Sequence, residues 1–599
     1  MKTYGQVRLV EASRAPGARR ARGYSWLIVA EPHVMVRLKR HFPRVNDAVV
    51  GRAWIQDTPE VARDLEWFCE RFPLEFDPEA RSHLAARAGE HRQREEAIHA
   101  VLSGTYQAQL PFQMAKPPRE YQKVAAEMLL RTGRLLLADD VGLGKTVSAI
   151  ATFSDPRTLP ALVVTLTHLP RQWQDMLKEF APHLRTHVLR GTKPYPLDEV
   201  GRHRQRQGAL ALPQESRFPD VILTSYSKIP GWAAELAPHI RSVTFDEIQE
   251  LRTGPGTAKY EAALHLAGSA GFRLGLSATP IYNLGSEIHS VVNALAPDAL
   301  GSREEFVREW CADAQWKVDA TGQTSVKGAI ADPKAFGIYL RDQGLMLRRT
   351  RAEVGRELPP LTRVRHVVDC DTGALDAVAG DAARLAQIIL AQGGKGIDKM
   401  EAAGELDWRL RQATGIGKAP FVADFVRLLV ESGEPVVLYG WHHAVYDIWR
   451  ERLADLNPVF YTGTESVTQK DAAKAEFIAG RAKVLVMSLR AGAGIDGLQG
   501  CCKTVVKGEL DWSPGVHEQA EGRVYRDGLR DPVMVYYLVS DEGSDPEVSA
   551  SLNLKTGQIA GIRDPAAPLV AKLQADPDRM KRLAEAYLVR HRPAAARSA

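Results

Sequence analysis

Residues 137–146, Leu-Ala-Asp-Asp-Val-Gly-Leu-Gly-Lys-Thr, combine the residue types and the spacing of a loop that binds phosphate. Gly142 and Gly144 lack a Cβ atom, so the backbone can curl and direct its N–H groups at phosphate oxygens. Lys145 can reach the β- and γ-phosphates, and the Thr146 hydroxyl can ligate Mg²⁺. The loop lies between an apolar run and a helical pattern, which is the strand–loop–helix context of a phosphate site. The alternative is a glycine turn beside a surface lysine, and it is disfavoured because such a turn does not require that context. The sequence therefore predicts a nucleoside triphosphate and Mg²⁺ as ligands.

Two adjacent carboxylates follow another apolar run about a hundred residues further along the chain. A strand that ends in Asp246 and Glu247 would deliver both side chains to the carboxyl edge of a parallel sheet, where ligands of such sheets bind. Asp246 suits the Mg²⁺ shell, and Glu247 suits orienting and deprotonating an attacking water molecule. An Asp-Glu pair after a strand is common by itself, but its distance from the phosphate loop favours hydrolysis of the triphosphate.

Two arginines near the end of the chain could complete such a site. Arg523 and Arg526, in the segment 519–526, are three residues apart and would share one face of a helix. Arginines in this position can stabilise the charge that develops during phosphoryl transfer. A helix with two solvated arginines is the alternative, and it would be favoured without the other motifs.

Two further segments carry polar residues that suit the same chemistry. Gln122, in the segment 118–122, has an amide that can donate to and accept from the edge of adenine. Taken alone, this segment is read equally well as a surface loop. Ser277 and Thr279, in the segment 275–283, again follow an apolar run. They could hydrogen-bond the acidic pair and sense the γ-phosphate.

Composition limits the class of protein. The chain has 599 residues, of which 45% are hydrophobic and 25% charged, as in ordinary globular proteins with three or four domains. The net charge of +5 is small for this length and does not by itself indicate nucleic acid. The five cysteines form no Cys-x-x-Cys pair, and no run reaches the ~20 apolar residues that cross a bilayer. We expect a soluble protein of the cytoplasm of a bacterium or a phage-infected host.

Short apolar runs alternate with helical patterns, which predicts an α/β fold with two parallel sheets, each covered on both faces. The first block spans 111–295 and the second 416–545, with helical insertions and a linker at 296–415 and a helical tail at 546–599. Strands are expected at 134–138, 161–165, 220–224, 242–245, 273–277, 435–439, 482–487, 503–506 and 533–538.

Residues 1–110 carry no nucleotide chemistry and predict a small α+β accessory domain. Strands are expected there at 24–30 and 34–38. Trp26, Arg40 and Phe42 could grip a DNA junction or a displaced strand. Packing in a core beneath a solvated face is the alternative, and it is favoured on general grounds.

The ordered motifs resemble those of the Swi/Snf-type ATPases of helicase superfamily two. The resemblance leans toward the annealing-helicase and fork-remodelling branch and toward compact phage and bacterial members, and it covers roughly residues 111–545. The matching segments are 138–146, 246–249, 277–283, 347–354, 357–360, 511–514 and 519–526.

The resemblance implies two tandem RecA-like doubly wound lobes with ATP in the cleft between them and a duplex-DNA track across both. The implied ATP-binding residues are Arg119, Gln122, Asp140, Gly142, Leu143, Gly144, Lys145 and Thr146. The implied catalytic residues are Lys145, Asp246, Glu247, Gln519, Arg523 and Arg526, with Thr146 and Asp246 at the metal. The implied coupling residues are Ser277, Ala278 and Thr279, and the implied DNA contacts are Thr224, Ser225, Tyr226, Gly463, Thr464, Ser488 and Arg490.

Several positions depart from the family pattern without removing a catalytic group. They are Asp140 for Glu, Leu166 and His168 for Pro and Ser, Gln249 for His, Ala278 for Gly, and the segment 492–498, in which the role of Asp496 stays open.

The resemblance implies a monomeric, DNA-stimulated ATPase that translocates on double-stranded or branched DNA and reanneals or branch-migrates strands. The alternatives are a conventional strand-separating DNA or RNA helicase, and a nucleotide-gated recruitment factor with little turnover.

Overall fold

The computed structural model describes residues 2–16, 23–42, 45–197, 218–281, 285–318, 324–356, 358–390, 396–489, 495, 497–526 and 528–552. The chain divides into two compact units. The first comprises Met1–Tyr106 with Asp342–Gly344, and the second comprises Gln107–Arg341 with Leu345–Ala599. Among the described residues, no helix is both long enough and apolar enough to span a bilayer. The cysteines are free thiols.

The first unit is an α+β domain with one small sheet of strand order β3-β2-β1-β4. Its elements are β1 (Gly5–Glu11), β2 (Tyr24–Ala30), α1 (Pro32–His41), β3 (Ala53–Gln56), α2 (Pro59–Arg71), β4 (Glu75–Phe76) and α3 (Pro78–Leu102). Trp26 is fully buried and donates from Nε1 to Asp57 Oδ1 at 3.1 Å, and Phe42 is also buried. The two aromatic rings considered for DNA therefore belong to the core.

The strand expected at 34–38 is wrong, because this segment lies within helix α1. Pro32 occupies the first turn, where its missing N–H costs nothing. Val34, Met35 and Leu38 are buried while Val36 between them is exposed, which is helical rather than alternating spacing.

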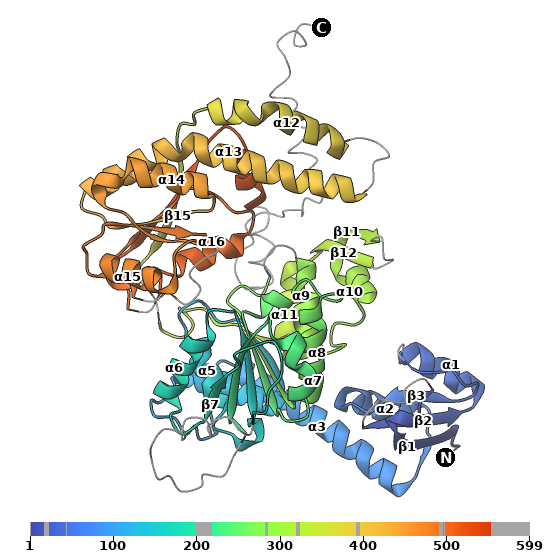
Figure 1. Cartoon of the computed structure of the whole chain (residues 1–599). Coiled ribbons are helices and arrows are strands. Elements are labelled where there is room, and N and C mark those ends of the chain that lie inside the picture. The colour runs from blue at the N-terminus through green and yellow to red at the C-terminus, as the bar shows by residue number, and fades with distance from the viewer. Residues whose placement is uncertain are drawn as a thin grey trace. The chain divides into compact units, whose positions relative to one another are not determined.

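The first lobe of the second unit is built on a seven-stranded sheet of order β13-β5-β10-β9-β6-β8-β7, in which every described pair is parallel. The strands are β5 (Arg134–Leu137), β6 (Ala161–Thr165), β7 (Thr186–Val188), β8 (Val221–Ser225), β9 (Ser242–Asp246), β10 (Phe272–Leu276) and β13 (Met346–Leu347). The helices are α4 (Glu120–Thr132), α5 (Lys145–Thr152), α6 (Pro170–Phe180), α7 (Ile229–Leu236), α8 (Ala258–Ser269), α9 (Ile288–Leu295), α10 (Arg303–Trp310) and α11 (Pro333–Asp342). Helices α5 and α6 lie on one side of the sheet and α7 and α8 on the other (Figure 1).

The second lobe has a six-stranded parallel sheet of order β14-β19-β18-β15-β17-β16. Its strands are β14 (Leu361–Val367), β15 (Val436–Gly440), β16 (Val459–Tyr461), β17 (Val484–Ser488), β18 (Thr504–Lys507) and β19 (Val533–Val539). Its helices are α12 (Gly373–Leu390), α13 (Gly396–Glu431), α14 (His443–Arg452), α15 (Val467–Ile478) and α16 (Pro514–Glu521).

Successive residues of β15 pack into two different cores of this lobe. Leu438 joins the cluster formed with α13 and α14, whereas Tyr439 joins the cluster formed with α15 and α16. Because a strand buries both faces only when both are covered, the apolar run at 435–439 fits the doubly wound architecture. The α/β fold with two parallel-sheet lobes is confirmed.

The segment 296–415 differs from the expected helical linker. Strand β13 joins the first sheet, β14 joins the second, and β11 (Cys311–Val318) and β12 (Thr324–Ile330) form an antiparallel hairpin. Helix α13 continues from Gly396 to Glu431, across the boundary expected at 415, because its second half packs into the second lobe's core. The expected tail at 546–599 is described only as far as residue 552.

Candidate nucleotide site

The phosphate loop joins the end of β5 to the start of α5, as the sequence indicates. Gly142 and Gly144 have φ values of 87° and 71°, in the left-handed region that favours glycine. A Cβ atom on Gly144 would lie 2.6 Å from Gln122 Nε2, so this position also needs glycine for space. Lys145 donates from Nζ to the carbonyl oxygens of Asp139 at 2.8 Å and Asp140 at 3.3 Å. Burial lowers the pKa of Lys145.

Gln122 is buried and supports the phosphate loop. Its Oε1 accepts from the backbone N–H of Arg119 at 2.9 Å, and its Nε2 donates to the Leu143 carbonyl at 3.0 Å. The Tyr121 hydroxyl donates to the same carbonyl at 3.1 Å. Because both ends of the Gln122 amide already have protein partners, reading adenine would require these hydrogen bonds to be exchanged.

Asp246 is held in one orientation by two donors. Its Oδ2 accepts from Trp173 Nε1 at 2.7 Å and from Thr165 Oγ1 at 2.9 Å. Burial and the neighbouring charge of Glu247 raise the pKa of Asp246 to about 6, although the two hydrogen bonds and Lys145 oppose that shift. The Asp246 carboxylate and the hydroxyl of Thr146, the residue after Lys145, are oxygen donors of the kind that Mg²⁺ prefers. These residues therefore fit the predicted metal site.

Glu247 is the second member of the acidic pair, and its backbone is strained. Its φ of 54° lies in the left-handed region, which costs a residue other than glycine on the order of 1–3 kcal/mol. Gln249 Nε2 donates to Glu247 Oε2 at 2.5 Å. Gln249 stands where the resembling family has His, so here an amide instead of an imidazole holds the carboxylate.

The coupling residues lie beside the loop and the acidic pair. In the sheet, Leu276 pairs with both Leu137 and Asp246, which brings the three strand ends together. Ser277 Oγ accepts from the backbone N–H of Thr279 at 3.0 Å, and both side chains are buried. The described hydrogen bonds of these two residues do not reach the acidic pair, and their direct contact with it stays a prediction.

Two arginines after β13 hold the start of the phosphate loop. Arg348 donates to the Ala138 carbonyl at 2.8 Å and to Asp140 Oδ1 at 2.7 Å. Arg349 binds both carboxylate oxygens of Asp139, at 3.1 and 2.6 Å. Asp140, expected to bind ATP, thus pairs with protein. The Leu-Arg-Arg run was visible in the sequence, but its target more than 200 residues away was not.

The second lobe brings Arg523 toward the acidic pair. Burial lowers the pKa of Arg523, and the charge of Glu247 opposes this shift, so the two groups lie within electrostatic reach. A Cβ atom on Gly522 would lie 2.8 Å from Val141 Cγ1 in the phosphate loop. Arg526 donates instead to the carbonyl oxygens of Gly522 at 3.1 Å and Ile495 at 2.9 Å. Helix α16 ends at Glu521, so Arg523 and Arg526 follow the helix and do not share one of its faces as expected. Gln519 lies on α16 and is half-buried, and its catalytic role stays a prediction.

A buried charge network lies beneath α16 and was not foreseen. Lys507 is fully buried, donates to the His517 carbonyl at 3.2 Å and lies 4.7 Å from the ring centroid of Tyr439. Burial lowers the pKa of Lys507 to about 8. Glu521 accepts from Arg363 Nη2 at 2.7 Å, which ties α16 to β14. The network fixes the helix that leads into Arg523.

The expected DNA contacts in the first lobe need correction. The side chains of Thr224, Ser225 and Tyr226 are all buried, and the Tyr226 hydroxyl donates to the Asp246 carbonyl at 2.9 Å. They are buried because they end and follow β8, an inner strand of the covered sheet. Tyr226 therefore supports the acidic pair, the Ser225 hydroxyl bonds that of Ser227 at 3.0 Å, and none of the three side chains is exposed.

The expected DNA contacts in the second lobe differ in exposure. Gly463 and Thr464 are exposed, whereas Ser488 is buried. Arg490 and Asp496 lie outside the described residues.

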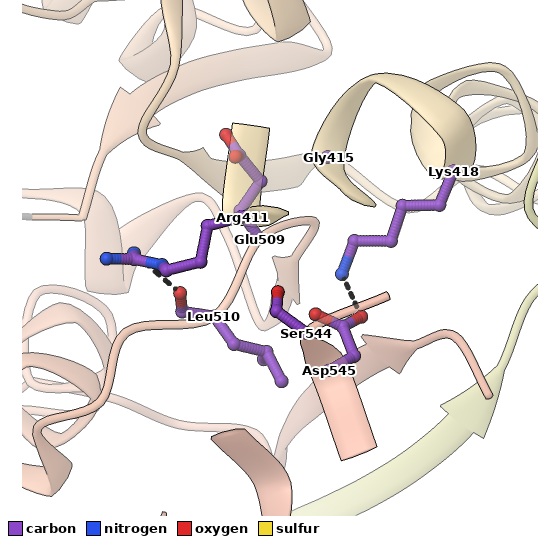
Figure 2. A pocket seen from close by; sticks show the side chains of 7 residues that line it. All are labelled: Arg411, Gly415, Lys418, Glu509, Leu510, Ser544 and Asp545. Carbon is purple, nitrogen blue, oxygen red and sulfur yellow. Dashed lines mark hydrogen bonds and ion pairs between the residues drawn. The ribbon is translucent and has the colours of Figure 1, made fainter. Parts of the chain in front are cut away.

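The second lobe also contains a small polar pocket away from these groups (Figure 2). Lys418 Nζ lies 2.5 Å from Asp545 Oδ2 and also donates to the Leu538 carbonyl at 3.0 Å, and Arg411 donates to the Leu510 carbonyl at 2.9 Å. The remaining lining residues are Gly415, Glu509 and Ser544. Lys418 pairs with Asp545 inside the pocket, whereas Glu509 bonds His442 Nδ1 at 2.6 Å outside it, so each of these charged groups has a protein partner and the pocket is a structural feature of the lobe.

Comparison with known proteins identifies the family of the chain. A family model described as the SNF2-related domain matches residues 84–387. The chain is 26% identical over 422 residues to the SWI/SNF-related matrix-associated actin-dependent regulator of chromatin subfamily A-like protein 1 of Xenopus tropicalis, covering 69% of this chain and 41% of that protein. It is 25% identical to the DNA annealing helicase and endonuclease ZRANB3 of Mus musculus, covering 72% and 39%. The chain thus spans about two fifths of the length of these curated relatives.

Among solved structures, the chain is similar to the Sulfolobus solfataricus SWI2/SNF2 ATPase core in complex with dsDNA. The identity is 22%, the TM-score is 0.35, and the match covers 77% of this chain and 97% of that one.

Trp173→Phe tests the support of Asp246. The substitution keeps a buried ring but removes the donor at 2.7 Å from Asp246 Oδ2, so the pKa of Asp246 should rise further and protons should compete more strongly with Mg²⁺. We expect the Mg²⁺ concentration for half-maximal ATP hydrolysis at neutral pH to rise about tenfold, as for loss of a hydrogen bond to a charged group. Trp232→Phe, which loses a bond to the Gly191 carbonyl in the same lobe, is the control. Equal Mg²⁺ dependence in both variants would contradict the assignment.

Lys507→Met tests the buried network through pH. The pKa of Lys507 is lowered from 10.5 to about 8 in the folded chain, so the unfolded chain binds more protons between those values. The stability contribution of Lys507 therefore rises with pH across that window. Relative to Lys507→Met, the wild-type chain should gain about 2 kcal/mol between about pH 7.5 and about pH 9.5, measured by chemical denaturation. The half-exposed Lys503, changed to Met, should show no such trend. A pH-independent difference for Lys507→Met would refute this assignment.

Proposed function

Because this chain belongs to the SNF2-related family, we propose that it is an ATPase that duplex DNA stimulates and that moves along duplex DNA. The finer proposal is that it reanneals or branch-migrates strands, or displaces bound protein, in replication, recombination or repair. The relative of Mus musculus named above as a DNA annealing helicase and endonuclease supports the annealing part of that proposal.

The observation that carries the proposal is a composite site made by two lobes. The first lobe supplies the phosphate loop, Asp246 and Glu247, and the second lobe supplies Arg523 within electrostatic reach of Glu247. Gly522 of the second lobe meets Val141 of the loop itself. A site that needs both lobes can act only when they meet, so each hydrolysis event is linked to their relative position.

The chain's own groups have distinct roles in this proposal. The loop N–H groups and Lys145 bind the phosphates at the start of α5, where the helix dipole favours negative charge. Asp246 and Thr146 would hold Mg²⁺, which neutralises phosphate charge when bound. Glu247, oriented by Gln249, accepts a proton from the attacking water molecule. Arg523 stabilises charge on the transferred phosphoryl group.

Turnover should depend on both lobes. Lys145→Ala and Arg523→Ala should each lower the rate of ATP hydrolysis about a hundredfold or more, because an arginine finger and the loop lysine act on the same phosphates. Arg526→Ala should lower the rate as well, because Arg526 bonds the Gly522 and Ile495 carbonyls and so holds the segment that carries Arg523. Lys178→Ala and Arg481→Ala, which remove exposed ion pairs from the first and second lobes, are matched controls that should retain the wild-type rate. Full activity of Arg523→Ala would refute the composite site. A recruitment factor, in contrast, would keep its biological activity in Glu247→Gln.

The class of nucleic acid can be identified by comparing ATPase rates measured with duplex DNA, single-stranded DNA and RNA. Duplex DNA should raise the ATPase rate more than single-stranded DNA or RNA of equal length, and stimulation by RNA alone would refute the proposal. Displacement of a triplex-forming strand, without unwinding of a forked duplex, is the result expected of a translocase. Efficient unwinding of the fork would instead identify a conventional helicase.

A further inference from the structure

One guanidinium connects the phosphate loop with the arginine segment of the second lobe. Arg351 lies between β13 and β14 and donates from Nε to the Val141 carbonyl at 2.9 Å. Its Nη2 donates to the same carbonyl and also to the Tyr525 carbonyl at 2.9 Å. The guanidinium carbon lies 4.7 Å from the ring centroid of Tyr525.

The two carbonyls that Arg351 joins are placed at the centre of the proposed site. Val141 lies in the phosphate loop, directly before Gly142. Tyr525 lies between Arg523 and Arg526, the residues that the second lobe contributes. A shift of either carbonyl therefore acts on Arg351 and, through it, on the other side of the site.

The Arg351 guanidinium is largely buried and is surrounded by groups that affect its charge. Burial lowers the pKa of Arg351, Asp140 and Tyr525 oppose this shift, and the positive charge of Arg526 adds to it. Among the described residues, its Nη1 is buried without a hydrogen-bond partner. Since buried polar groups are nearly always paired, this donor is available to a protein carbonyl that moves when the two sides of the site rearrange.

Lysine could not make the same connection. The planar guanidinium donates in several directions at once and stacks on an aromatic ring, whereas an ammonium group is a compact point charge. Arg351 lies in the segment 347–354 that carries the family resemblance, and the ATPase chemistry described above does not use it.

We propose that Arg351 is a positioning residue that sets the placement of the Arg523–Arg526 segment against the phosphate loop. Its effect is on the catalytic step and not on ATP affinity, since it bonds protein carbonyls on both sides. This inference rests on the proposed ATPase activity and is independent of translocation on DNA.

The test compares Arg351→Ala, Arg351→Lys and Arg365→Ala in the full chain. Arg365 lies on β14, is half-exposed and pairs with Asp541 at 3.5 Å. Arg365→Ala is therefore a control that also removes an arginine close to the segment between β13 and β14. We expect Arg351→Ala to lower kcat for ATP by about tenfold to a hundredfold, as for misplaced catalytic groups, with KM changed less than about threefold. Arg351→Lys should recover only part of kcat, and Arg365→Ala should match the wild type.

Hydrogen–deuterium exchange provides a readout that does not depend on turnover. Without nucleotide, amides of residues 521–526 should exchange faster in Arg351→Ala than in the wild type, and amides in the core strand β15 should not. Unchanged kcat, unchanged exchange at 521–526, or faster exchange throughout the second lobe would each overturn the proposal. A wild-type chain without ATPase activity would overturn the proposed function instead, and the exchange pattern would still decide the role of Arg351.

Discussion

Asp139 and Asp140, at the start of the phosphate loop, are held by Arg349 and Arg348, and the geometry of the nucleotide site depends on those ion pairs. Arg349 grips both oxygens of Asp139, and Arg348 joins Asp140 to the Ala138 carbonyl. Removing one partner of a buried ion pair costs about 3–5 kcal/mol, because the other charge stays desolvated. Arg348 and Arg349 therefore fix the conformation of the loop before any phosphate reaches its N–H groups.

The same ion pairs explain how one segment serves both lobes. Strand β13 pairs with β5, the strand that leads into the loop, and β14 begins the second sheet soon after. The segment that follows β13 and leads to the second lobe therefore passes beside the phosphate loop. Arg348, Arg349 and Arg351 follow within four residues of β13 and contact the loop in turn.

The local sequence pattern was sufficient to predict the residues of the site that directly follow a strand. The loop glycines, and the carboxylates after β9, follow from short-range rules, and the parallel register then brings Leu137, Asp246 and Leu276 together. The partners of those residues could not be predicted, because Trp173 and Arg349 reach them across long stretches of sequence. The burial of Tyr226 was missed for the same reason, since strand order in the sheet is a tertiary property.

Lobe boundaries were also beyond local pattern. A two-residue strand such as β13 has no periodicity to detect, and β14, with its alternating arginines, reads as a charged helix or loop. The burial of Lys507 could not be predicted, because lysines are usually exposed. The ring of Tyr439 and the charge of Glu521 stabilise the buried ammonium group.

The short connector between β13 and β14 has a further consequence. Thirteen residues separate Leu347 from Leu361, and a fully extended chain covers at most about 3.6 Å per residue. Arg523 therefore stays tethered to the site it completes, and its binding is an intramolecular event. For short linkers the effective concentration of such a tethered group is on the order of millimolar. How often Arg523 meets the site therefore does not depend on how much protein the cell contains.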